Sequence, residues 1–362
     1  MRIIFIDSLA IITAIFLLIF SAFAFSRKNG SVLRHRILAS FLLANALYII
    51  DFCLPVIINV TGINLLWFNG IGTAFGFLFG PLLYFYTKSI TQKDFHFKKT
   101  DSIHFAIFLI IILLTLIKFQ FTYVYLYFAL YLQITPYMIV CIKLILNYHH
   151  TLKNYFSSIN KLNLTWMLYV VGAFFVMWIL DLINFTLYNL HLTSRGFGLY
   201  LTFFSLMINF IFAILIFYRA LQHPEIFAGI GEDEKQQKYE HSRLTDEEKV
   251  EYLEKLVDYF KKDKPFLNPE LTITEVARKL NVSVKYLSQV INESLGKNFY
   301  DFINSYRIEE AKRQLANESK SKKTVLEVLY DSGFNSKSAF NSAFKKHTGF
   351  TPTEFRKRPL IN

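Results

Sequence analysis

The sequence predicts an all-α protein in two parts, a polytopic bundle of seven transmembrane helices followed by a smaller cytoplasmic all-α domain. Two observations predict this fold class. Long apolar stretches fill the chain before residue 220, where 15 basic and 5 acidic side chains leave a net charge of +10. The rest has the composition of a soluble protein, with net charges of −6 over 220–277 and +8 over 278–358. A wholly soluble protein is therefore excluded.

Seven stretches approach the roughly 20 apolar residues with which a helix crosses a bilayer. They lie near Ile3 to Phe25, Ile37 to Val60, Leu65 to Tyr86, Ile103 to Ile117, Phe121 to Leu146, Leu164 to Phe185 and Leu199 to Tyr218. The fourth and fifth are close enough to form one re-entrant unit, which would make the number of spans even. Residues 1–25 could instead be a signal peptide, since Ala22 and Ala24 resemble a cleavage site, but this apolar stretch is long for one.

Lys and Arg in the connections predict the orientation, because cytoplasmic connections are enriched in them. Connections 26–36, 87–104 and 147–163 carry ten, whereas the N-terminus and the alternate connections carry three. We therefore expect the N-terminus outside, everything after Tyr218 inside, and a location in the inner (cytoplasmic) membrane.

Three acidic side chains, Asp7, Asp51 and Asp181, lie in the predicted spans. Carboxylates are costly in hydrocarbon and so mark candidate functional sites. All three fall towards the outer side of their helices. They indicate an outward-facing pocket for a cation, a proton or a polar ligand, with Asp51 the stronger candidate; alternatively, Asp7 and Asp181 lie at the membrane interface. The sequence does not identify the signal, which could be a ligand or a partner membrane protein.

Residues 220–244 predict a hinge, because a proline, two glycines and an acidic run interrupt the apolar pattern. Thr245 and Glu248 then form a capping box, in which each side chain bonds a free backbone N–H at a helix start. Residues 245–264 form an amphipathic connecting helix with a short apolar stripe. We expect it to pack on the domain that follows; the alternative is a helix that forms a homodimer.

Residues 265–358 contain a two-copy repeat. In each copy a Thr-x-x-Glu capping box opens a short helix, a serine caps a second helix and a glycine ends it. The repeated positions, 52 or 53 residues apart, are Thr272 and Thr324, Ser283 and Ser336, and Gly296 and Gly349. Two short helices joined by a tight turn are a helix-turn-helix unit. We predict units at 272–293 and 324–347, joined by a long helix over about 298–315.

The region also carries a specific residue set: Ala277, Ser283, Leu287, Gly296, Phe299, Arg307, Ala311, Leu315, Gly333, Phe334, Ser338, Phe340, Phe344, Lys345, Gly349, Phe350, Thr351, Pro352 and Arg356. With these residues the sequence resembles the DNA-binding domain of the AraC-type (AraC/XylS) transcription regulators over about 95 residues. The stretch from Gly333 to Pro352 is the most diagnostic. Leu329 and the pair Asp331-Ser332 depart from the family's small or apolar residues. The seven spans take the place of the family's usual cytosolic sensor, as in membrane-anchored members.

The resemblance implies that the second helix of each unit enters the major groove of double-stranded DNA, with the long helix separating the two by about one helical turn. Their polar faces suit this role, because Asn, Gln and Lys pair with base edges. The candidate base-contacting residues are Lys285, Tyr286, Ser288, Gln289, Asn292, Asn335, Lys337, Ser338, Asn341 and Ser342. The candidate phosphate-contacting residues are Arg307, Arg313, Lys345, Lys346, Arg356 and Lys357. The alternative for each residue is a solvated surface position.

The sequence thus favours a membrane-bound, sequence-specific DNA-binding transcription regulator whose transmembrane bundle senses or anchors. Its partners would be DNA and the lipid bilayer. We find no motif of a nucleotide-binding, metal-dependent or kinase active site, and both cysteines, Cys53 and Cys141, lie in apolar stretches. We expect neither enzymatic activity nor a cofactor or metal. Two alternatives remain: a transporter or channel with a regulatory tail, and an intramembrane enzyme built on Asp51 or Asp181.

Overall fold

The computed structural model describes residues 2–28, 32–92, 95–117, 123–159, 162–192, 194–222, 244–316 and 323–357. The chain divides into two compact units. The N-terminal unit comprises Met1–Leu146 with Leu164–Gly231, and the C-terminal unit comprises Asn147–Asn163 with Glu232–Asn362. The cytoplasmic connection predicted at 147–163 thus belongs to the C-terminal unit. Most of the predicted hinge lies outside the described residues.

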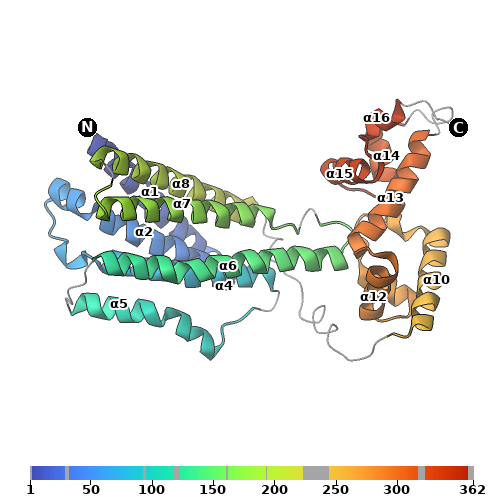
Figure 1. Ribbon diagram of the computed structural model, residues 1–362, viewed down its shortest axis with the longest axis horizontal. Coiled ribbons are helices and arrows are strands. Elements are labelled where there is room, and N and C mark those ends of the chain that lie inside the picture. Colours follow the sequence, from blue (N-terminus) through green and yellow to red (C-terminus); the bar gives the residue numbers. More distant parts are fainter. Residues whose placement is uncertain are drawn as a thin grey trace. The chain divides into compact units, whose positions relative to one another are not determined.

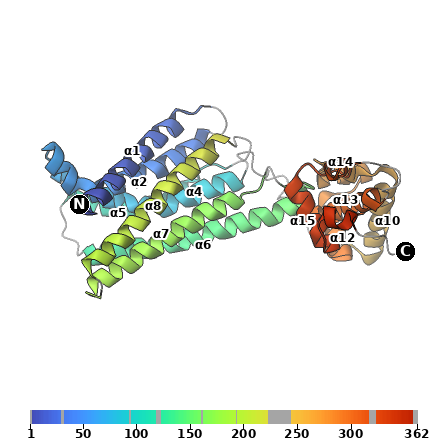
Figure 2. The same ribbon diagram turned by 90° about the horizontal axis from the view of Figure 1, so that it is seen from above.

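The N-terminal unit is built from helices that run side by side (Figures 1 and 2). They are α1 (Arg2–Ser26), α2 (Val32–Thr61), α3 (Ile71–Phe75), α4 (Phe79–Thr91), α5 (Ala106–Leu116), α6 (Tyr123–Tyr155), α7 (Thr165–Asn189) and α8 (Arg195–Gln222). The described part of the unit also contains the 3-10 helices η1 (Leu66–Phe68), η2 (Gly76–Leu78) and η3 (Lys99–Phe105). The all-α class is confirmed for the described residues.

Six described helices are long and apolar enough to cross a membrane. They are Phe5–Ser26, Val32–Thr61, Lys99–Leu116, Tyr125–Tyr155, Thr165–Asn189 and Gly196–Leu215. The third predicted span, Leu65 to Tyr86, instead forms η1, α3, η2 and the first part of α4. Glycines explain the interruption, because they weaken a continuous helix; Gly70, before α3, has a φ of 84°.

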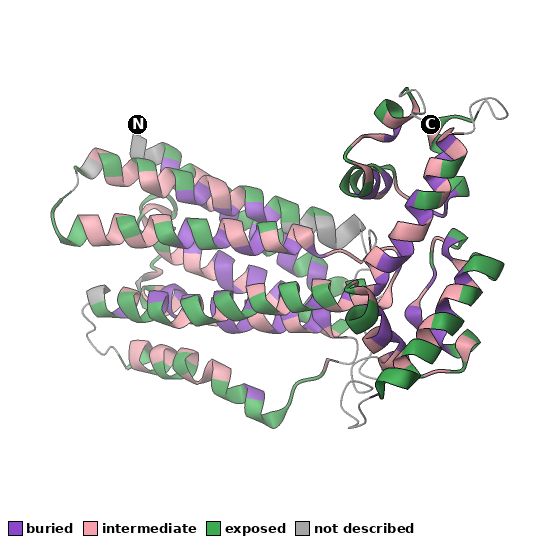
Figure 3. Cartoon of the chain, turned by 45° about the vertical axis from the view of Figure 1, so that its right-hand side comes forward, coloured by how far each residue is buried: buried purple, intermediate pink, exposed green. Residues whose placement is uncertain are grey.

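Aromatic side chains fill the interior of this unit. Phe41, Phe79, Phe174 and Phe212, from four different helices, are buried, with ring centroids 5.5–6.1 Å apart where they touch. Large apolar side chains also cover the outside of the helices, and α5 contains no buried residue. Figure 3 colours the described positions by burial, with exposed positions along the long helices of this unit. An apolar exterior on an apolar core is the pattern of helices that face lipid.

The C-terminal unit is also helical. Its elements are α10 (Asp246–Asp263), η5 (Pro265–Leu267), α11 (Ile273–Leu280), α12 (Val284–Leu295), α13 (Phe299–Ala316), α14 (Val325–Asp331), α15 (Lys337–Thr348) and α16 (Pro352–Arg356). The capping boxes expected at Thr245, Thr272 and Thr324 are confirmed, and Thr351 forms another at the start of α16. Ser283 and Ser336 each accept a hydrogen bond from the backbone three residues later, as predicted helix caps.

Two apolar cores hold this unit together. The first joins α10, η5, α11 and α12 to the N-terminal half of α13, and its central side chains include Leu256, Phe260 and Leu287. The second joins α14 and α15 to the C-terminal half of α13, around Phe340 and Phe344. Leu256 and Phe260 of α10 are completely buried in the first core. The prediction that the amphipathic connecting helix packs on the domain that follows it is therefore confirmed.

Candidate functional sites

The first helix-turn-helix unit presents a polar face on α12. Asn281 ends α11 in the left-handed conformation, and the N–H of Val282 donates to the carbonyl of Ala277 over 3.0 Å. This turn directs the apolar stripe of α12 inward. The candidate base-contacting residues lie outside that stripe: Lys285, Tyr286, Ser288 and Gln289 are half-buried, and Asn292 is exposed. Within α12, the Gln289 side chain donates to the carboxylate of Glu293, and the Asn292 side chain donates to the carbonyl of Ser288.

The second unit presents a more exposed polar face on α15. Gly333 makes the turn with a φ of 89°, and the N–H of Phe334 donates to the carbonyl of Leu329 over 3.1 Å. The candidate residues of this unit, Asn335, Lys337, Ser338, Asn341 and Ser342, are all exposed. Phe340 and Phe344, on the opposite face of the helix, are completely buried. The departures from the family pattern fit this core, since Leu329 is buried and the Ser332 hydroxyl donates to the Leu329 carbonyl.

Basic side chains flank α15. Lys345, Lys346 and Lys357 are exposed, and Arg356 is half-buried. Lys346 forms an ion pair with Asp301 of α13, with 2.9 Å between Nζ and Oδ1. Burial tends to raise the pKa of Asp301, but the hydrogen bond and charge of Lys346 outweigh it and hold this pKa below its usual value.

Arg307 differs from the other candidate phosphate contacts, because its side chain is 1% exposed. Nε donates to the carbonyl of Phe266 over 2.7 Å, and Nη2 to that of Asn268 over 2.7 Å. Nη1 donates to the Ser157 carbonyl over 3.0 Å, and Nη2 also donates to the Ser157 hydroxyl over 3.2 Å. Burial lowers the pKa of Arg307 to about 10. Four of the five guanidinium N–H donors thus bond protein atoms in the interior, so the prediction that Arg307 contacts a DNA phosphate is wrong.

A sequence signal could have revealed the position of Arg307. The residue lies four positions after Ile303 and four before Ala311, and both of these are buried on the same face of α13. Arg313 lies on the outer face of that helix, where it pairs with Glu310.

Residues 155–158 join the C-terminal unit through contacts that the sequence did not predict. Tyr155 packs on the first core. Phe156 forms an antiparallel bridge with Thr272, and the N–H of Ser157 donates to the Leu271 carbonyl over 3.1 Å. The Ser158 hydroxyl donates to Oδ1 of Asn335 over 3.1 Å. These contacts link residues more than 100 positions apart, so no local pattern indicates them.

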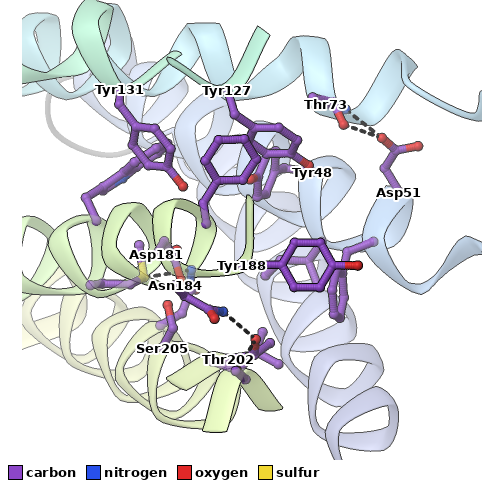
Figure 4. A pocket seen from close by; sticks show the side chains of 18 of the residues that line it. Tyr48, Asp51, Thr73, Tyr127, Tyr131, Asp181, Asn184, Tyr188, Thr202 and Ser205 are labelled. Carbon is purple, nitrogen blue, oxygen red and sulfur yellow. Dashed lines mark hydrogen bonds between the residues drawn. The ribbon is translucent and has the colours of Figure 1, made fainter. Parts of the chain in front are cut away.

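The N-terminal unit contains a second candidate site, a cavity with a volume of about 530 Å³. Asp51 and Asp181 both line it, together with amide, hydroxyl and aromatic side chains, whereas Asp7 is not among its lining residues (Figure 4). Tertiary structure thus brings together two of the three acidic residues that the sequence singled out.

Comparison with known proteins identifies similarity to helix-turn-helix regulators. Residues 276–358 match a family model described as "Helix-turn-helix domain". An "uncharacterized HTH-type transcriptional regulator" of Staphylococcus aureus (strain COL) is 34% identical over 93 residues, which are 25% of this chain and 12% of that protein. An uncharacterized HTH-type transcriptional regulator in the cgkA 5′ region of Pseudoalteromonas carrageenovora is 35% identical over 88 residues, 24% of this chain and 50% of the relative. The chain thus matches at most half the length of these two relatives.

Among solved structures, the C-terminal domain of AraT, a response regulator from Geobacillus stearothermophilus, is 30% identical. The alignment covers 33% of this chain and 92% of that one, with a TM-score of 0.27.

Proposed function

Since residues 276–358 form a helix-turn-helix domain of the AraC type, we propose that the protein is a membrane-bound, sequence-specific DNA-binding transcription regulator. In this proposal α12 and α15 enter successive major grooves on one face of the duplex. The transmembrane bundle senses a signal or anchors the domain, with the N-terminus outside and the DNA-binding domain in the cytoplasm.

The observation that carries the proposal is the two-sided character of both second helices. Each has one face buried in an apolar core and an opposite face of Lys, Asn and Ser side chains, with Gln289 in addition on α12, that are half-buried or exposed. These side chains supply the hydrogen-bond donors and acceptors that distinguish base pairs in the major groove. A helix that only stabilised a bundle would not require this composition on its exposed face.

Phosphate contacts are assigned to Lys345, Lys346, Arg356, Lys357 and, on α13, Arg313. Such contacts fix the position of a protein on DNA without selecting sequence. Two of these cations are partly neutralised within the protein, since Lys346 pairs with Asp301 and Arg313 pairs with Glu310. The predicted salt-dependent share of the affinity therefore rests mainly on the other three.

Binding of the full chain in lipid nanodiscs to random-sequence DNA tests the proposal. The full chain is needed because a fragment that contains only the helix-turn-helix domain would lack Ser157, whose carbonyl accepts a hydrogen bond from Arg307. We expect enrichment of a site whose two contacted blocks lie about one helical turn apart. Lys337→Ala combined with Asn341→Ala should abolish the enrichment, and Lys255→Ala on α10 should not. Binding without sequence preference, or none, would refute the proposal.

A further inference from the structure

We propose that the cavity of the N-terminal unit binds a small organic ammonium ion, with Asp181 as its counter-ion. This inference deepens the proposed sensing role of the bundle and depends on it only for its biological consequence. The cavity volume of about 530 Å³ lies within the roughly 300–1,000 Å³ of small-molecule sites.

The charges of the cavity select the sign of the ligand. Among the described residues that line it, two are carboxylates and none is Lys, Arg or His. An anionic ligand would meet repulsion there and no compensating cation. Because charge is costly within a membrane, an excess of carboxylate calls for a cation or a proton.

Asp51 is already engaged by the protein. Its Oδ1 accepts from the N–H of Gly70 over 3.0 Å, and its Oδ2 accepts from the N–H and the hydroxyl of Thr73 over 2.9 and 2.6 Å. The carboxylate thus stabilises the start of α3. The helix packs closely there, since a Cβ atom on Gly72 would lie 2.3 Å from the Cβ of Asp51.

Asp181 is engaged much less. The Ser205 side chain is its polar neighbour in the cavity lining, and no ion pair to Asp181 occurs among the described residues. Although the sequence favoured Asp51 as the signal site, the geometry points to Asp181 as the carboxylate available to a ligand.

Aromatic rings suit an organic rather than a hydrated inorganic cation. Tyr127 and Tyr131 of α6 lie across the cavity from Asp181 and Asn184 of α7 (Figure 4). The Tyr131 ring packs edge-on against Trp178, with 5.0 Å between centroids. The faces of Tyr and Trp rings attract ammonium groups, more strongly when water is excluded.

Unpartnered polar atoms give a second, independent indication of a ligand. Nδ2 of Asn45, Oδ1 of Asn209 and Nε1 of Trp178 are buried in the described structure without a hydrogen-bond partner. All three residues line the cavity and are more than nine-tenths buried. Leaving such a group unsatisfied costs about 1–3 kcal/mol, so a polar ligand that bonds them would bind more tightly. The ligand class is therefore an amine with a further hydrogen-bonding group.

The test measures binding of tyramine to the full chain in nanodiscs without DNA, by calorimetry. Tyrosol, in which a hydroxyl replaces the amino group, is the matched neutral probe. We expect tyramine to bind at least tenfold more tightly than tyrosol. Asp181→Asn should weaken tyramine binding at least tenfold and leave tyrosol binding within twofold, whereas Asp7→Asn, outside the cavity lining, should change neither.

Equal binding of the two probes, or binding of neither, would overturn the proposal. So would displacement of tyramine by millimolar sodium or potassium, which would assign the cavity to an inorganic ion. If Asp181→Asn does not fold, the comparison of the probes on the unmodified protein remains decisive, and Tyr131→Leu should still weaken tyramine selectively. DNA enrichment is measured separately, so failure of amine binding and failure of the DNA-binding proposal are distinguishable.

Discussion

The first helix-turn-helix unit packs against α10, η5 and Tyr155, whereas the second packs mainly on α13 and α16. Both units begin with the same capping box and end with a left-handed glycine. Their surroundings differ, and so do their surfaces: the candidate base-contacting residues of α12 are mostly half-buried, and those of α15 are all exposed. Equal local sequence patterns thus yield two units with unequal access to a partner.

The turns of the two helix-turn-helix units also differ in their surroundings, at one equivalent residue. Asn281 and Gly333 occupy equivalent positions of the repeat, and both have positive φ, 55° and 89°. A Cβ atom at Gly333 would lie 2.4 Å from the carbonyl oxygen of Phe266, a residue of the first core. The second turn therefore packs against the first half of the domain, and only glycine fits there.

Arg307→Ala should have the largest effect, because the Arg307 side chain is buried and its hydrogen bonds join α13 to residues 266–268 and to Ser157. The substitution leaves the carbonyls of Phe266 and Ser157 without this donor, whereas the carbonyl of the exposed Asn268 keeps the N–H of Leu271. Each buried unsatisfied group costs about 1–3 kcal/mol and the cavity left by the side chain adds to this, so we expect a loss of at least about 3 kcal/mol. Hydrogen exchange of α11 to α13 in the full chain measures it. Arg313→Ala, at an exposed ion pair, should cost less than about 1 kcal/mol; similar losses for the two variants would contradict the assignment.

Gly333→Ala should come next. Strain from a positive φ and the approach to Phe266 together predict a destabilisation of roughly 2–3 kcal/mol. Gly349→Ala is the matched control, since its φ is 80° but nothing lies within 4 Å of the added Cβ atom. It should cost about 1 kcal/mol from strain alone. The free energy of unfolding of the second unit, from hydrogen exchange, distinguishes clash from strain; equal losses would show that the close approach to Phe266 is unimportant.

Substitutions on α12 and α15 would test whether the more exposed side chains contribute more to DNA binding. If exposed side chains contribute more, Lys337→Ala with Asn341→Ala should weaken specific DNA binding on the order of 100-fold, as expected for two base contacts of about 1–3 kcal/mol each. Lys285→Ala with Gln289→Ala should weaken it on the order of tenfold. Titration of the enriched site at fixed salt measures both. The reverse order would mean that the first unit dominates recognition.

Asp301→Asn should have the smallest effect on stability. Its pair with Lys346 is partly exposed and contributes less than about 1 kcal/mol. Because the pKa of Asp301 is depressed in the folded protein, this contribution is present at neutral pH and is lost as pH falls through the folded-state pKa. In Asp301→Asn the acid-dependent part of the stability should disappear. Lys346, released from its ion pair, should make DNA binding depend more steeply on salt concentration. Unchanged pH and salt profiles would argue against both roles.

Much of the C-terminal unit could be predicted because its determinants are local. A capping box acts within three residues, a glycine sets its own φ, and an apolar stripe follows the helical repeat. Thr272, Ser283 and Gly296, with their counterparts 52 or 53 residues later, were therefore sufficient to place α11, α12, α14 and α15. The same local hydropathy identified the apolar helices of the N-terminal unit.

Tertiary structure decided what depends on distant partners. The sequence showed Arg307 as a cation, but only the carbonyls that surround it make it a buried structural residue. Residues 155–158 join the C-terminal unit through partners more than 100 positions away. In the N-terminal unit the sequence favoured Asp51 over Asp181, but folding places the N–H and the hydroxyl of Thr73 against the Asp51 carboxylate. Local geometry is set by neighbours in the chain, whereas burial, charge compensation and access are set by residues that the chain brings together only when it folds.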